Sequence, residues 1–113
     1  MKLQHQKLAS GRWQKLSFFG QMANIGSEVE RAIGWRKKGN DLYSRKAAKR
    51  ALELLFFTIG DLKNKNRLKE LTRLYEVLVD YFFGQNQYSS SDCLWQKYFY
   101  AFNYAARINV KQF

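Results

Sequence analysis

The residue types that most often carry catalysis are scarce in this chain. It has one histidine, His5, and one cysteine, Cys93, and they lie far apart in the sequence. A nucleophilic cysteine needs a base that the fold holds beside it, and a zinc site needs a cluster of Cys and His ligands. The sequence shows neither, and no phosphate-binding glycine motif either. It therefore predicts a protein that is not an enzyme, with no catalytic residues, no metal and no cofactor.

Basic residues form the most informative constellation. The net charge is +11, and residues 1–50 hold twelve Lys or Arg against three acids. The stretch GWRKKGNDLYSRKAAKR at 34–50 holds seven of these cations and a single acid, Asp41. Phosphate binding needs long cationic side chains on an open surface without acids that neutralise them. A polyanionic partner, and nucleic acid first, is therefore predicted.

The predicted nucleic-acid site is centred on one helix. In the helix expected at 41–59, at 100° per residue, the four cations Arg45, Lys46, Lys49 and Arg50 cover an arc of about 140° opposite the apolar stripe. Trp35 and Tyr43 lie in the same stretch, where they either stack on unpaired bases or hold the turn together. No base-reading set stands out, so we expect contact with the backbone and weak sequence specificity, with RNA or a mixed duplex as ligand. The predicted phosphate-binding residues are Arg45, Lys46, Lys49 and Arg50, then Arg36, Lys37 and Lys38, and in the N-terminal arm Lys2, Lys7, Arg12 and Lys15.

Apolar spacing predicts four helices that position these residues. After a basic arm at 1–16, in which Trp13 and Leu16 are candidates for docking, a helical domain fills 17–113. The absence of proline favours helices over strands and tight turns. We therefore predict an all-α fold, an antiparallel (up-down) four-helix bundle with a basic N-terminal arm. The expected helices span 17–38, 41–59, 66–83 and 91–108, with a polar linker at 61–66 and a fraying tail at 109–113.

Each predicted helix has an expected core face, and caps mark its ends. Ser17 and Asn40 or Asp41 are predicted N-caps, and Gly39 suits the position after the first helix. Glu28 lies three residues before Arg31, which predicts a helical ion pair. The expected core faces are Phe18, Met22, Ile25, Val29 and Ile33; Ala47, Ala51, Leu52, Leu55 and Ile59; Leu68, Leu71, Tyr75, Leu78 and Phe82; and Leu94, Tyr98, Phe102 and Ala105.

Two further groups predict contacts with protein. Small residues lie along one side of the first helix, where they favour close helix contact. Aromatic residues surround the fourth helix more fully than a core stripe needs, which favours a partner or a homo-oligomer. The predicted interface residues are Ala23, Gly26 and Gly34, together with Trp95, Phe99, Tyr100 and Tyr104.

No apolar run is long enough for a secretory signal or a membrane span. The lone cysteine gives no support to an oxidising compartment. We therefore expect a cytoplasmic, soluble protein that does not bind membranes.

The run NIGSEVERAIGWRKKGN…RKAAKRALELL…RLKELTRLYE resembles a group of small bacterial proteins that carry GSEV-x-RA and RALELL patterns. That resemblance implies a helical bundle and an intracellular location. In size, charge and helix number the chain is also similar to the accessory variability proteins of diversity-generating retroelements. This looser likeness implies a pentameric four-helix protein that binds a reverse transcriptase and nucleic acid, and it assigns no functional residues.

Three hypotheses follow. The first is a non-enzymatic accessory protein, a homo-oligomer, that binds nucleic acid. The second is a protein–protein interaction or scaffold subunit without nucleic acid. The third and weakest is a cryptic enzyme that uses Glu28 or Glu76.

Overall fold

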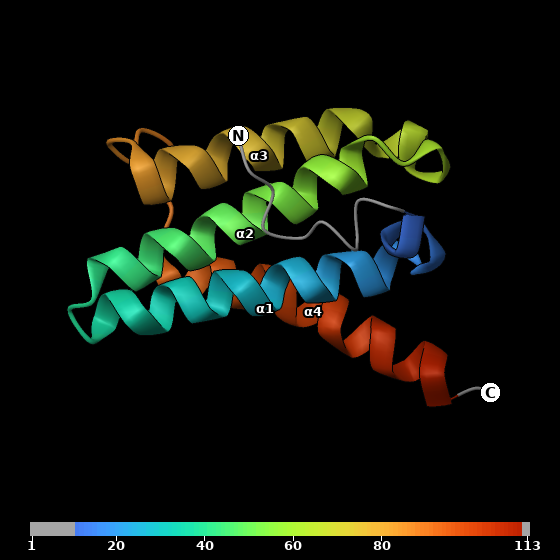
Figure 1. Ribbon diagram of the computed structural model, residues 1–113, viewed down its shortest axis with the longest axis horizontal. Helices are drawn as coiled ribbons and strands as arrows, with labels where there is room; N and C mark the ends of the chain where they lie inside the picture. The colour runs from blue at the N-terminus through green and yellow to red at the C-terminus, as the bar shows by residue number, and fades with distance from the viewer. Residues whose placement is uncertain (1–10, 112–113) are drawn as a thin grey trace.

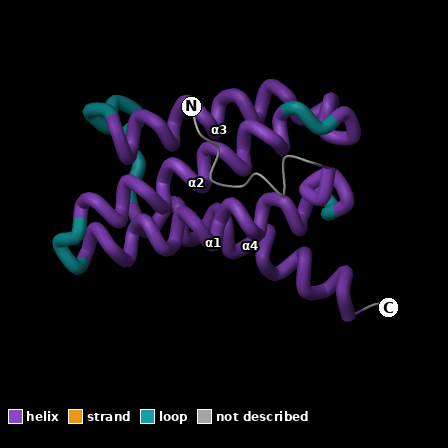
Figure 2. Tube along the Cα trace, in the orientation of Figure 1, coloured by secondary structure: helices purple, strands orange, loops and turns teal. Residues whose placement is uncertain are grey.

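The computed structural model describes residues 11–111, and every regular element within them is a helix (Figures 1 and 2). Side chains are described as far as residue 108. Four α-helices pack together, which confirms the predicted all-α class. They are α1 (Phe18–Lys37), α2 (Asp41–Ile59), α3 (Leu68–Phe83) and α4 (Asp92–Lys111), with short 3-10 helices η2 (Trp13–Lys15) and η3 (Leu62–Arg67) before α1 and α3.

Local chemistry sets the helix ends. The Ser17 hydroxyl accepts a hydrogen bond from Gly20 N, and the Asn40 side chain accepts one from Tyr43 N, so both predicted N-caps are confirmed. Gly39 adopts a φ of +80°, a left-handed conformation in which a side chain would be strained. The result is a three-residue connection between α1 and α2, which holds the two helices side by side.

The helix contacts differ from those of a square four-helix bundle, in which each helix contacts two neighbours equally. In Figure 1, α2 runs back beside α1, α3 runs back beside α2, and α4 crosses behind α1. The helix α1 contacts α2 and α4, while α2 also contacts α3. Long side chains link α3 to α4, and the Tyr81 hydroxyl donates to Asp92 Oδ1 at 2.5 Å. Burial, together with the Asp92 carboxylate, raises the pKa of Tyr81 to about 12.

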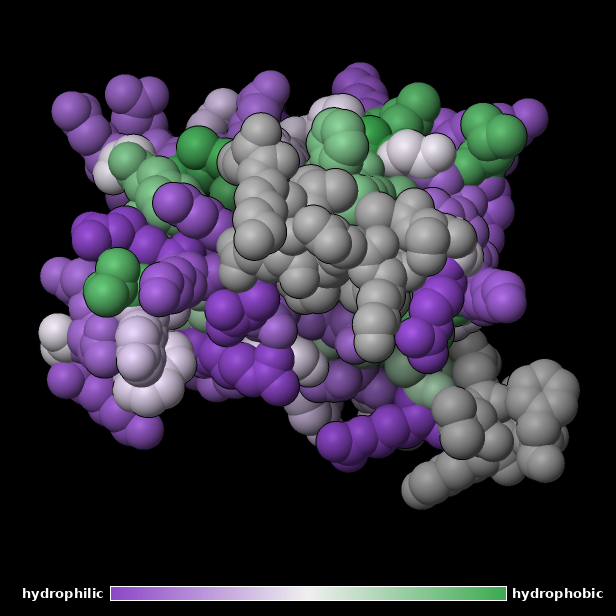
Figure 3. Space-filling model, in the orientation of Figure 1, coloured by the Kyte–Doolittle hydropathy of each residue, from purple (hydrophilic) through white to green (hydrophobic). Residues whose placement is uncertain are grey.

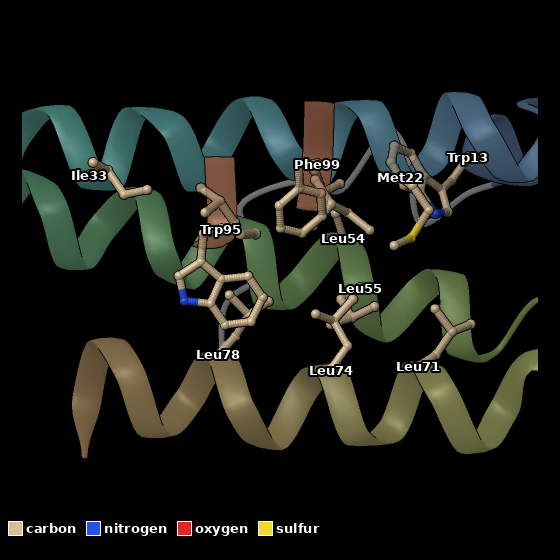
Figure 4. Close-up of a cluster of buried hydrophobic side chains, with 13 residues drawn as sticks. Trp13, Met22, Ile33, Leu54, Leu55, Leu71, Leu74, Leu78, Trp95 and Phe99 are labelled. Carbon is tan, nitrogen blue, oxygen red and sulfur yellow. The ribbon is translucent and has the colours of Figure 1, made fainter. Parts of the chain in front are cut away.

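One buried cluster joins all four α-helices (Figure 4). Most of the predicted faces of α1, α2 and α3 contribute to it, and Met22, Ile25 and Leu55 have no exposed surface. In Figure 4, leucines of α3 point toward α2, and Trp95 and Phe99 of α4 point into the same cluster. The predicted seam of α3 is shifted, because Leu68 is 43% exposed whereas Leu74 is buried.

The predicted core face of α4 is confirmed in part, because Tyr98 and Phe102 pack against the buried cluster, but the centre of the face lies elsewhere. Leu94 is 57% exposed, whereas Trp95 and Phe99 are 6% and 4% exposed. A Cβ atom on Gly26 would lie 2.8 Å from the Phe99 Cβ, so the glycine lets α1 and α4 approach closely. Trp95, Phe99 and Gly26 therefore make their contacts within the chain. Their prediction as interface residues is corrected, because each of the three is buried by contacts within the chain.

The part of the predicted arm that the structure describes is packed on the helices. Trp13 is 1% exposed, and its indole Nε1 donates to Thr58 Oγ1 at 2.9 Å. The Gln21 amide donates to Trp13 O at 3.1 Å. These bonds attach residues 11–16 to the beginning of α1 and the end of α2.

A buried polar network continues from that attachment into η3, which replaces the predicted linker. Gln21 Nε2 donates to Asp61 Oδ2 at 2.9 Å, and Asn64 Nδ2 donates to Gln21 Oε1 at 2.9 Å. Lys63 Nζ donates to Asp61 Oδ2 at 2.6 Å. A buried polar group without a hydrogen bond destabilises the folded state. Each of these side chains must therefore keep its partner, and the network fixes the position of η3 against α1.

Asp61 is expected to make stability depend on pH. Burial by itself would raise its pKa, but hydrogen bonds from Lys63 and Gln21 bring the pKa below its ordinary value. A carboxyl whose pKa is lower in the folded state stabilises the fold above its unfolded pKa of about 3.9, and this stability is lost as pH falls through the folded value. Asp61→Asn should remove this part of the acid-induced loss, measured as urea unfolding at pH 7, 5 and 3.

The matched control is Asp41→Asn, which removes an exposed carboxylate that has no ion pair among the described residues. It should retain the steep loss of unfolding free energy below about pH 4. Equal pH profiles for Asp61→Asn and the unmodified protein would contradict the assignment.

Candidate nucleic-acid interface

Five predicted phosphate-binding residues are exposed on the hairpin that α1 and α2 form. We call them the hairpin cations, and none of them makes an ion pair with a carboxylate in the described part of the chain. Ala47, Ala48 and Ala51 are buried, which turns the cationic side of α2 outward. In Figure 3, hydrophilic colour dominates the part of this hairpin that is not behind grey atoms. The hairpin cations are Lys37, Lys38, Arg45, Lys46 and Lys49.

Arg36 differs from the hairpin cations because the fold uses its guanidinium. It lies 4.7 Å from the ring centroid of Tyr81 and 4.8 Å from that of Phe82. It also donates to Tyr81 O at 3.4 Å. These contacts hold the end of α1 against α3, so Arg36 is better explained by packing than by phosphate binding.

The two predicted stacking residues contact each other across the α1–α2 turn. The ring centroids of Trp35 and Tyr43 are 5.0 Å apart, with the ring planes at 85°. Lys38 Nζ lies 5.2 Å from the Trp35 centroid, and Lys46 Nζ lies 5.6 Å from the Tyr43 centroid. The arrangement is the one expected of residues that hold the turn together. It also fixes two of the hairpin cations beside aromatic rings.

A buried carboxylate lies beneath two arginines farther along the hairpin. Arg31 Nη1 is 2.5 Å from Glu28 Oε1, which confirms the predicted helical ion pair. Arg50 Nε, from α2, is 2.8 Å from Glu28 Oε2. The Glu28 side chain is 10% exposed, the Arg50 side chain 30% and the Arg31 side chain 60%. Sequence reasoning placed Arg50 in the open basic arc and did not find its bond to Glu28.

The two arm cations that the structure describes, Arg12 and Lys15, do not join this surface. Lys2 and Lys7 lie outside the described residues, as does His5. Arg12 and Lys15 are exposed, but they lie beside the end of α2, where Lys63 Nζ donates to Gln14 O. The α1–α2 turn is at the other end of α2, about 28 Å away by the rise of its 19 residues.

The remaining predicted interface residues lie on α1 and the outer side of α4. Tyr100 and Tyr104 are 68% and 58% exposed. Ala23 and Gly34 are half-buried, and a Cβ on Gly34 would meet no atom within 4 Å. An open groove of about 480 Å³ runs over the contact between α1 and α4, and Gly26, Phe99 and Tyr100 are among its lining residues.

No protein-family model matches the chain, and no curated protein or solved structure is significantly similar to it. Among the described residues, no helix is long and apolar enough to cross a membrane. In the same part of the chain, no three His, Cys, Asp or Glu side chains are grouped so that they could hold a metal ion.

Proposed function

We propose that the protein is a non-enzymatic accessory protein that binds nucleic acid through the hairpin cations. The observation that supports this most is the set of five exposed Lys and Arg side chains on one hairpin, none paired with a described carboxylate. Because no described carboxylate neutralises them, such cations can pair with an external anion. A phosphate backbone supplies many anions at regular spacing. Backbone contact carries no sequence information, so the binding is weakly sequence-specific.

A salt titration tests the proposal. If all five hairpin cations neutralise phosphates, the logarithm of affinity falls with the logarithm of salt concentration at a slope of roughly −3.5 for a single strand and −4.5 for duplex DNA. Single-stranded RNA, duplex RNA and an RNA–DNA duplex are compared by fluorescence anisotropy between 50 and 300 mM salt. Binding that ignores salt, or no binding at the lowest salt, would refute the function.

The expected ligand is RNA or a mixed duplex, in line with the likeness to retroelement accessory proteins. That likeness also suggests a homo-oligomer with up-down helices and a reverse transcriptase as protein partner. Copurification with a reverse transcriptase encoded beside this gene tests the partner separately from the nucleic acid.

A second candidate is an interaction or scaffold subunit without nucleic acid, and the exposed rings of Tyr100 and Tyr104 favour it. Large apolar side chains at the surface are typical of protein interfaces. Light scattering should then show an oligomer that Tyr100→Ser with Tyr104→Ser disrupts. Charge reversal at the exposed Lys46 and Lys49, which have no ion pair among the described residues, should leave that oligomer intact.

A further inference from the structure

We propose that Arg31 and Arg50, both ion-paired to Glu28, together bind one backbone phosphate of the nucleic acid. We call this pair of arginines the clamp. In this arrangement Glu28 is a positioning residue that never touches the ligand. The inference rests on the proposed function and names a specific contact within it.

The geometry leaves both guanidinium groups with donors to spare. A guanidinium carries five N–H groups, and each arginine has one bond to the Glu28 carboxylate. Arg31 donates through Nη1 and Arg50 through Nε, to different oxygens of the same carboxylate. The other N–H groups have no hydrogen-bond partner among the described residues. Arg31 is exposed and Arg50 is half-buried, and two planar forks with free N–H groups match the oxygens of a phosphate.

The clamp is continuous with the hairpin cations. Lys46 and Arg50 are four residues apart on α2, and Arg31 and Trp35 are four residues apart on α1, so each pair shares a helix face. The contact of Trp35 with Tyr43 joins α1 to α2 near the turn. Arg50 joins them again about 10 Å farther along, by the rise of seven residues from Tyr43. One strand that follows the hairpin from the turn would meet Lys46 and then the clamp.

The burial of Glu28 gives the carboxylate a role that net charge alone does not predict. By charge alone, an acid next to a phosphate site weakens binding. A buried carboxylate that fixes two long side chains has the opposite effect, because their rotamer freedom is lost on folding and not on binding. Glu28 is on α1 and Arg50 on α2, so the bond also fixes the relative position of the two forks.

The decisive variant is Glu28→Gln, compared with Glu30→Gln. Each removes one negative charge, but Glu30 is exposed and, among the described residues, accepts from Gln96 and forms no ion pair with Arg31 or Arg50. We expect Glu28→Gln to weaken binding of a short oligouridylate by about threefold to tenfold, despite its higher charge. Glu30→Gln should bind as tightly as the unmodified protein, or tighter. Both are measured at one salt concentration, with circular dichroism and a thermal midpoint to show that each is folded.

Unchanged or tighter binding by a folded Glu28→Gln would overturn the clamp, and Glu28 would then only join α1 to α2. Should Glu28→Gln not fold, Arg50→Lys provides the test, because it keeps the charge and removes the fork. We expect Arg50→Lys to weaken the oligouridylate complex about threefold or more. Equal affinity for Arg50→Lys would again overturn the proposal.

Inorganic phosphate distinguishes a backbone contact from a free-anion site. We expect phosphate to compete with oligouridylate no better than sulfate at equal ionic strength, because the clamp is one contact among several. Specific competition by phosphate alone, retained in Lys46→Glu, would overturn the assignment to the nucleic-acid backbone. The salt titration of the unmodified protein tests the proposed function, whereas the Glu28 and Arg50 variants test the clamp. Salt-dependent binding with unaffected variants would therefore refute the clamp and leave the proposed function standing.

Discussion

Replacing Lys46 and Lys49 together by glutamate is expected to lower the affinity for single-stranded RNA at least tenfold at 50 mM salt. Both side chains are exposed, and neither has an ion pair with a described carboxylate. Losing two phosphate contacts should also reduce the salt slope by roughly 1.4, from about −3.5 toward −2. Fluorescence anisotropy at four salt concentrations gives both quantities.

The matched control is the pair Lys65→Glu and Lys69→Glu. It changes the net charge by the same amount, but on η3 and α3, away from the hairpin cations. We expect this control to lose affinity only slightly, with a slope close to that of the unmodified protein. Equal losses in both double variants would mean that overall charge attracts the RNA and that the hairpin is not the site.

Helix positions could be predicted from the sequence because their signals are local. Ser17 and Asn40 bond to backbone groups three residues away, and Gly39 adopts the conformation its position requires. The alternation of cations and alanines in α2 likewise fixed which side of that helix is exposed. In each case, neighbouring residues and helical periodicity were enough.

The contacts that reassign individual residues are long-range and could not be predicted in this way. Arg50 pairs with Glu28 across 22 residues, and Arg36 reaches Tyr81 across 45. On α4, aromatic residues occur on several sides, so periodicity does not identify which side packs against Gly26 of α1. A buried polar network has an even weaker signal, because Gln21 and Asn64 look like surface residues until their partners are known.

Trp13 presents the second large expected effect, on stability. Trp13→Ala should lower the free energy of unfolding by about 3–5 kcal/mol, as for other large aromatic residues removed from a core. The indole is 1% exposed and lies in the main buried cluster. Urea unfolding followed by circular dichroism measures the loss, because Trp35 and Trp95 complicate fluorescence. A loss below about 1 kcal/mol would contradict the docking of residues 11–16.

Trp13→Phe separates packing from the hydrogen bond and suits the measurement if Trp13→Ala does not fold. It retains much of the buried ring but removes the donor to Thr58 Oγ1. Thr58→Val removes the acceptor, and also the bond from Thr58 Oγ1 to Leu54 O. We expect the double variant to be less destabilised than the sum of the two single variants, by about 0.5–1.5 kcal/mol. Strict additivity would mean that the N-terminal segment is attached by burial of the indole alone, without the bond that fixes its orientation.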